Sequence, residues 1–162
     1  MEKLCANCRS LRVESACGIC AAPLCRKCRI FLEEDAFELA EGPRPAELKH
    51  SYYCGSCYDE KVEPFKTEYE ATLEQAKAVN VIYAGSKSHI RIIRKAIRAI
   101  EIKGSRDRDE TILKLAFQAA RAGYNSLIDV EISSQKLRNQ GWQTSTWTGR
   151  GIPAEILVRQ EF

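Results

Sequence analysis

The sequence predicts an α+β fold made of a small cysteine-rich module, a helix, and a small antiparallel sheet covered by one helix. Three observations lead to this prediction. All eight cysteines lie within the first 57 residues, an apolar stripe with helical spacing follows them, and the second half combines one capped helical segment with alternating apolar segments. We therefore divide the chain into the module (1–60), a connector helix (61–79) and an α+β domain (80–162).

The cysteines form four pairs with one internal spacing, Cys-x-x-Cys. Two thiolates at this spacing can bind one ion from a single tight turn, so four pairs supply the ligands of two tetrahedral zinc sites. A redox dithiol or disulfides are the alternatives, but the chain opens without the apolar segment of a secretory leader. The pairs are Cys5/Cys8, Cys17/Cys20, Cys25/Cys28 and Cys54/Cys57.

The gaps between the pairs favour an interleaved arrangement. Eight residues separate the first two pairs, four the second and third, and 25 the third and fourth. Four residues are few for a boundary between two sequential sites, whereas interleaving would lock the segment into one compact cross-brace. We expect pairs one and three to hold the first zinc (Cys5, Cys8, Cys25, Cys28), and pairs two and four the second (Cys17, Cys20, Cys54, Cys57).

This cysteine framework, with a helix after its last pair, resembles that of FYVE zinc fingers and their relatives. The resemblance covers residues 5 to about 78 and implies a treble-clef, two-zinc module. FYVE domains bind phosphatidylinositol 3-phosphate through a tryptophan motif, a basic R-R/K-H-H-C-R stretch and an R-V-C. Those positions here hold Met1–Leu4, Val13–Gly18 and Tyr52–Cys54. We therefore expect the metal framework to carry over, and we expect no specific binding of phosphatidylinositol 3-phosphate.

The composition is that of a soluble globular protein, with 44% hydrophobic and 29% charged residues. No segment approaches the roughly 18 apolar residues of a membrane span, and we expect a cytoplasmic protein. The net charge of +3 is uneven: residues 1–80 hold 11 Lys/Arg against 14 Asp/Glu, and residues 81–162 hold 14 against 8. The basic second half keeps nucleic acid as a candidate partner.

Two segments link the cysteine pairs to the second domain. Residues 29–53 form a polar, acidic insertion, where we expect a short hairpin or a few extended residues packed on the zinc sites. After Cys57, apolar residues recur at steps of three and four and predict a packed connector helix, with Pro64 in its first turn. A coiled-coil arm is the alternative, although the stripe is short for one. The stripe consists of Val62, Phe65, Tyr69, Leu73 and Ala76.

The second domain is predicted to alternate strands with one helix. A strand opens it at 80–85, and residues 90–103 fit either a helix or a strand, with their β-branched side chains favouring a strand. Asp107 or Asp109 can cap the start of a helix over 107–122 and Gly123 is typical of its end, with a buried stripe ending at Ala122. A strand over 126–133 and return strands over 142–149 and 152–158 follow, separated by a polar turn near Gly141.

The segment Ala119–Val130 resembles the A-x-x-x-G-A-N-A-V-I-G-V junction of the YbjQ-type small bacterial proteins, a family described as heavy-metal-binding. Gly151 is similar to the glycine of that family's last strand, and Tyr124 and Asp129 depart from its pattern. The resemblance covers about residues 80–158. It implies a similar fold and a bacterial source, and no defined activity.

The sequence shows no catalytic motif, and we expect a protein without enzymatic activity. Asp129 and Glu131 are two residues apart on a predicted strand and therefore lie on the same face. Paired carboxylates can act as acid and base, but such a pair is usually part of an exposed polar surface. A candidate surface for an anion or a partner combines cations from 87–98 with aromatic and guanidinium groups near the C-terminus. Its members are Lys87, Arg91, Arg94, Lys95, Arg98, Trp142, Trp147 and Arg150.

Three functions remain open at this point. The favoured one is a non-catalytic zinc-binding adaptor that recognises another protein and self-associates through its second domain. The second is a nucleic-acid-binding protein that uses the basic second half. The third is a RING-like enzyme of the ubiquitin-ligase type; RING domains normally include a histidine among their metal ligands, which this set of eight cysteines does not.

Overall fold

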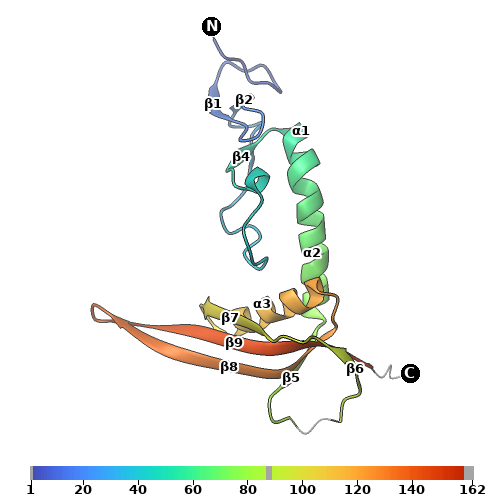
Figure 1. Ribbon diagram of the computed structural model, residues 1–162. Coiled ribbons are helices and arrows are strands. Elements are labelled where there is room, and N and C mark those ends of the chain that lie inside the picture. The colour runs from blue at the N-terminus through green and yellow to red at the C-terminus, as the bar shows by residue number, and fades with distance from the viewer. Residues whose placement is uncertain (1, 87–88, 159–162) are drawn as a thin grey trace. The chain divides into compact units, whose positions relative to one another are not determined.

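The computed structural model describes residues 2–86 and 89–158 (Figure 1). The chain forms two compact units, residues 1–70 and 71–162. The boundary between them falls inside helix α2 (Glu63–Lys77), whereas the sequence predicted a separate connector helix with a domain on either side. The two units are described one at a time.

Short antiparallel strand pairs hold the cysteine turns of the first unit. Strand β1 (Val13–Ala16) pairs with β2 (Pro23–Cys25), and β3 (Ile30–Phe31) pairs with β4 (Tyr52–Tyr53). The second pairing closes the insertion as a short hairpin, as the sequence predicted. Between its two strands the chain forms turns and the 3-10 helix η1 (Ala46–Leu48).

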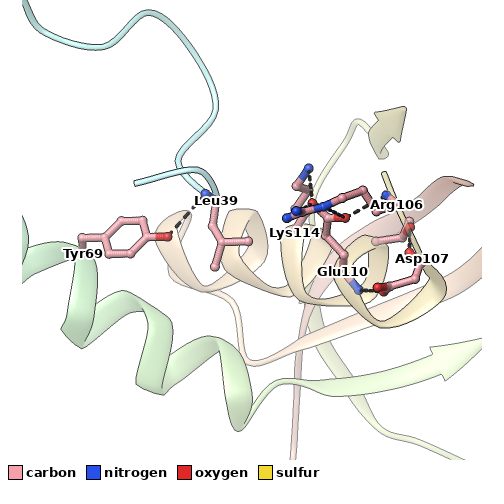
Figure 2. A network of polar contacts seen from close by, with 7 residues as sticks. Leu39, Tyr69, Arg106, Asp107, Glu110 and Lys114 are labelled. Carbon is pink, nitrogen blue, oxygen red and sulfur yellow. Dashed lines mark hydrogen bonds and ion pairs between the residues drawn. The ribbon is translucent and has the colours of Figure 1, made fainter. Parts of the chain in front are cut away.

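The insertion builds a small apolar core of its own. Tyr53 is fully buried, and its hydroxyl donates to the Glu47 carbonyl at 2.8 Å and accepts from the His50 N–H at 3.2 Å. The Tyr69 hydroxyl accepts from the Leu39 N–H at 3.3 Å (Figure 2). The phenol groups thus satisfy backbone groups that the turns of the insertion leave unpaired. The core consists of Leu32, Phe37, Leu48, Tyr53 and Val62.

The last cysteine pair opens a continuous helical segment. It begins with α1 (Gly55–Cys57), passes through a π-helical turn, η2 (Tyr58–Val62), and continues as α2. Pro64 lies in the first turn of α2, as expected, but helical backbone precedes it. The π turn is closed by the Glu63 N–H bonding the Tyr58 carbonyl. It widens the backbone where the proline ring would otherwise clash with the preceding turn.

The second unit contains a mixed sheet. Its strands among the described residues are β5 (Asn80–Tyr83), β6 (Ile92–Lys95), β7 (Ile100–Ser105), β8 (Ser126–Asn139) and β9 (Trp142–Ile156). The order is β5–β8–β9–β6, with β7 also paired to β9. Strand β5 runs parallel to β8. The wholly antiparallel sheet predicted from the sequence is therefore wrong at this edge, because alternation of apolar residues does not encode strand direction.

Residues 90–103 hold two strands, β6 and β7, which confirms the preference for strand over helix. Strands β8 and β9 are longer than predicted and form one hairpin. Its loop residues Gln140 and Gly141 both have positive φ, 47° and 86°, as in a type I′ turn. The sequence predicted a break in β9 at its glycines, but Gly149 serves packing: a Cβ there would lie 2.5 Å from the Thr111 side chain.

Helix α3 (Arg108–Arg121) covers one face of the sheet and contacts β7, β8 and β9 (Figure 1). Asp107 caps it by accepting from the Glu110 N–H at 2.7 Å, and Gly123, with φ 85°, ends it, as predicted. Ala122 is exposed at the C-cap, so its predicted place in the buried stripe is wrong. The buried residues of α3 are Thr111, Leu115, Ala116, Phe117, Ala119 and Ala120.

Asn125 fixes the junction between α3 and the sheet. Its side-chain amide donates to the Ile156 carbonyl at 3.0 Å and accepts from the Ile156 N–H at 2.9 Å. The side-chain amide therefore makes the two hydrogen bonds to Ile156 that the backbone of a neighbouring strand would otherwise make. None of the helices in the described part of the chain combines the length and the apolar character needed to cross a membrane.

Glu110 gives the second unit a stability that depends on pH. Burial by itself raises its pKa, but the Arg106 N–H and the Lys114 ammonium, at 2.7 and 3.0 Å, outweigh burial and lower the pKa to about 2 (Figure 2). A carboxyl whose pKa is lower in the folded state stabilises that state above the unfolded pKa of about 4.5, and the stabilisation is lost as the pH falls towards 2. We expect Glu110→Gln to lower the free energy of unfolding of this unit by about 1 to 2 kcal/mol at pH 7.

Urea unfolding followed by tryptophan fluorescence measures this difference, because both tryptophans lie in the second unit. The difference between wild type and Glu110→Gln should shrink between pH 4.5 and 2. Glu131→Gln is the matched control on the exposed part of β8 and should change little. Equal effects of the two substitutions at pH 7 would contradict this role of Glu110.

Candidate metal centres

Tight turns place the sulfur atoms of the first two cysteine pairs. In each turn the residue after the second cysteine donates its N–H to the carbonyl of the first cysteine at 2.9 Å. These residues, Arg9 and Ala21, adopt positive φ of 57° and 59°. A left-handed residue at this point reverses the chain, so both sulfur atoms of the pair face the same side.

The last pair lies on a helix instead of a loop. Cys54 is the N-cap of α1, and its sulfur accepts from the Cys57 N–H at 3.5 Å. The Tyr58 N–H bonds the Cys54 carbonyl at 3.0 Å and closes the first helical turn. The helix thus positions the final two sulfur atoms rigidly.

The structure gathers the eight cysteines into two groups of four. Within each group the sulfur atoms all lie within 4.8 Å of one another. Cys8 and Cys25 sulfurs are 3.5 Å apart, and those of Cys20 and Cys54 are 3.8 Å apart. A tetrahedral site with metal–sulfur bonds of about 2.3 Å has sulfur atoms about 3.8 Å apart, so both groups fit a metal ion. The groups are those of the interleaved pairing: Cys5, Cys8, Cys25, Cys28 and Cys17, Cys20, Cys54, Cys57.

The sulfur atoms differ in acidity because their hydrogen bonds differ. Backbone N–H groups of Cys8 and Cys25 lower the pKa of Cys5 to about 6. In the same group the Asn7 side chain lowers the pKa of Cys28, but side-chain hydrogen bonds with Cys8 and Cys25 outweigh it and raise that pKa to about 12. One thiolate therefore forms readily while a second in its vicinity is opposed by the negative charge already present. A bound cation removes that opposition, which is the chemistry expected of a four-thiolate metal site.

Two further side chains lie beside the metal groups, Asn7 and His50. The Asn7 side chain donates to the Cys28 sulfur at 3.4 Å and links the two turns of the first group. The His50 ring lies against Gly18 in the second group, where a Cβ on residue 18 would be 2.2 Å from the ring. Asn7 was not identified from the sequence and is recognisable only by its position between Cys5 and Cys8. His50, four residues before Cys54, was a possible substitute for a cysteine ligand in the sequence, and it is not among the residues of either group.

A cavity of about 650 Å³ lies beside the first cysteine group. Its polar lining comes from β1 with the segment before it, and from the turn that carries the third cysteine pair. Three cations and one carboxylate line it, and none of these four residues is buried. The cavity is lined by Cys8, Ser10, Arg12, Glu14, Cys25, Arg26 and Lys27.

The structure does not bring together the candidate anion surface predicted from the sequence. Lys87 lies outside the described residues. Arg94 is engaged by Glu155 at 2.6 Å, by the Gly123 carbonyl at 3.2 Å, and by the face of Tyr124 at 4.6 Å. Its charge is therefore already paired within the sheet.

The remaining members of that predicted surface are spread along β9. Lys95 pairs with Ala154, near the C-terminal end of β9, whereas Trp142 is the first residue of β9. Ala154 lies twelve extended residues after Trp142, which corresponds to about 40 Å. Trp147 and Arg150 lie between them. Arg91 and Arg98 flank β6 outside the strand. Strand β6 lies beside β9, but at the end of β9 away from Trp142, so residues that are close in sequence between 87 and 98 do not meet the tryptophan.

Asp129 and Glu131 do not form the regular strand pair that was expected. Asp129 has a positive φ of 50° and lies at a β-bulge, where the register between β8 and β9 shifts. Both side chains are exposed. The bulge therefore breaks the regular alternation in which the sequence placed these two carboxylates.

No protein-family model, no curated protein and no solved structure matches this chain.

The interleaved grouping predicts which cysteines share an ion. In protein loaded with cadmium in place of its native metal, we expect two cadmium resonances, because each group supplies four thiolates. Cys25→Ser should shift the same resonance as Cys5→Ser and leave the other unchanged. Cadmium NMR, with Cys17→Ser as the matched control for the second site, measures this directly. A resonance that responds to both Cys5→Ser and Cys17→Ser would show a sequential arrangement instead.

Proposed function

We propose that this chain is a non-catalytic zinc-binding adaptor whose first unit binds an acidic segment of a protein partner. The cavity beside the first cysteine group carries this proposal, because its lining includes Arg12, Arg26 and Lys27. The alternative, a nucleic-acid partner, is favoured by a different feature of the second unit.

Zinc is the ion that best suits the two sites. Four thiolates in a tetrahedral arrangement are typical of structural zinc, and they leave no position open for water or substrate. A structural role agrees with the small core of the first unit, since each such ion contributes on the order of 10 kcal/mol to folding. Reduced thiols of this kind are typical of the cytoplasm, where we place the protein.

The cavity favours an acidic ligand because of its charges. Its lining contains three positive side chains, Arg12, Arg26 and Lys27, and one negative side chain, Glu14. Arginine side chains bind carboxylates through paired hydrogen bonds, and a cavity of about 650 Å³ is of the size that takes several side chains.

A neighbouring strand offers backbone hydrogen bonds to the same ligand. In the part of the chain that is described, β1 has a strand partner along one edge only, β2. Glu14 lies on β1 and Arg12 just before it, so an extended segment beside β1 would lie next to the cavity. An extended peptide can add to such an edge through its main chain, while the cations select its acidic side chains.

The same charges do not imply a lipid function. Arg29, which follows the third cysteine pair, stacks over the Tyr52 ring at 4.4 Å and is engaged within the unit. The positions that bind phosphatidylinositol 3-phosphate in FYVE domains hold Val13–Gly18 here. The proposal therefore excludes specific recognition of that lipid.

Selection from a displayed random peptide library with the zinc-loaded chain tests the proposal. We expect enrichment of extended sequences rich in Asp and Glu, and a loss of at least tenfold in affinity for the double variant Arg12→Ser/Lys27→Ser, because two of the three cavity cations are removed. The matched control is Lys3→Ser/Lys49→Ser, which removes the same charge outside the cavity and should bind as the wild type does.

Two results would contradict the proposal. One is selection of peptides without acidic residues, or of peptides bound equally by the cavity variant and the control. The other is a marked preference for vesicles carrying phosphatidylinositol 3-phosphate over equally charged vesicles, lost in the cavity variant. The second result would assign the cavity to membranes.

A further inference from the structure

The β8–β9 hairpin extends beyond the rest of its sheet and beyond α3 (Figure 1). Strand β5 pairs with β8 only as far as Val130, and β7 pairs with β9 only as far as Trp147. Residues 135–146, which we name the ribbon, therefore have no strand partner except each other among the described residues. Every residue of the ribbon except Thr146 is exposed.

The length of the ribbon is not explained by the hydrophobic core of the second unit, because the residues of the ribbon are exposed except Thr146. A two-stranded hairpin without a covering layer is at best marginally stable, and its two open edges invite pairing with other chains. Lys136 and Arg138 lie on such an edge strand, where charge opposes that pairing. The ribbon is thus longer than the sheet requires, and its side chains are directed to solvent.

The ribbon lies in a basic segment without acidic residues. From Ile132 to Ala154 there is no Asp or Glu, while Lys136, Arg138 and Arg150 are cationic. Lys136 and Arg138 have no ion-pair partner in the described residues. Most other ribbon side chains are amides or hydroxyls, which donate and accept hydrogen bonds.

The register divides these side chains between two faces. Lys136 pairs with Ser145 and Arg138 with Gln143, and directly paired residues point to the same face. The opposite face carries Leu137 and Trp142, the latter 79% exposed. Neither face offers the contiguous apolar centre of a stable protein interface.

We propose that the ribbon binds duplex DNA in its major groove. That groove is about 12 Å wide and 8.5 Å deep, and it admits a two-stranded ribbon. The five residues from Gln135 to Asn139 span about 17 Å, so the tip can reach the base edges while the base of the ribbon stays outside. The face that carries both cations meets the DNA: Lys136 and Arg138 contact phosphates, and the amide of Gln143 on the same face is directed to the bases.

This assignment differs from the surface that the sequence predicted for nucleic acid. The cations of residues 91–98 include Arg94, which Glu155 neutralises. The ribbon cations have no such partner, and their charge remains available to phosphates. Both tryptophans of the chain lie in or beside the ribbon, so intrinsic fluorescence reports on its contacts.

Fluorescence anisotropy of a labelled 20-base-pair duplex, titrated with the zinc-loaded full chain across a salt series, tests the proposal. Two neutralised phosphates predict a slope of log K against log salt of about −2, or a loss on the order of tenfold between 50 and 200 mM salt. Lys136→Ala/Arg138→Ala should bring the slope close to zero and weaken binding at least tenfold at low salt. Tryptophan emission should change on binding in wild type, and less in Trp142→Phe.

The matched control is Lys95→Ala/Arg98→Ala, which removes the same charge from the second unit outside the ribbon and should bind within twofold of wild type. Metal content and far-UV circular dichroism establish that each variant is folded. The proposal is overturned if the control loses binding while the ribbon variant keeps it. It is also overturned if single-stranded DNA or duplex RNA binds more tightly than duplex DNA, because neither offers a wide major groove.

A second copy of the chain is the other occupant that the open edges admit. Sedimentation of wild type and the ribbon variant distinguishes it from DNA. Monomers in both proteins, together with DNA binding by wild type only, support the proposal. A dimer that depends on the ribbon, with no duplex binding by either protein, would overturn it.

Discussion

Four sulfur atoms from two separate turns meet at each of two points, and the first unit depends on this convergence. One group joins the turns at residues 5–8 and 25–28, and the other joins those at 17–20 and 54–57. Because the two groups interleave, each closes a loop that contains part of the other. A core of five buried residues is small for such a chain, and metal ions bound at the two groups would supply stability that it lacks.

The second unit depends on packing instead. Helix α3 lies close to β9 because Gly149 leaves room for Thr111 and Leu115, and Asn125 fastens the end of the strand to the helix junction. The part of the β8–β9 hairpin outside this core is exposed and basic. The first unit has a cationic cavity and the second a projecting ribbon, and these are the surfaces of the two binding proposals.

The sequence predicts those features that short-range chemistry determines. Cysteine spacing was sufficient to predict both metal groups, and Asp107 and Gly123 were sufficient to place α3. Features that depend on distant residues escaped prediction: the parallel pairing of β5 with β8, the pairing of Arg94 with a glutamate 61 residues away, and the meeting of Arg12 with Arg26 in one cavity. Each requires the folded chain to bring its partners together.

The most direct test of this account is removal of the metal from the full chain, followed residue by residue with amide NMR. The account predicts that a chelator collapses the resonances of residues 2–57 into the narrow range of an unfolded chain, leaves those of residues 80–158 dispersed, and that zinc restores the first set. Resonances of the first unit that stay dispersed after the metal is shown to be gone would contradict the account. A collapse of the second unit together with the first would contradict its independence.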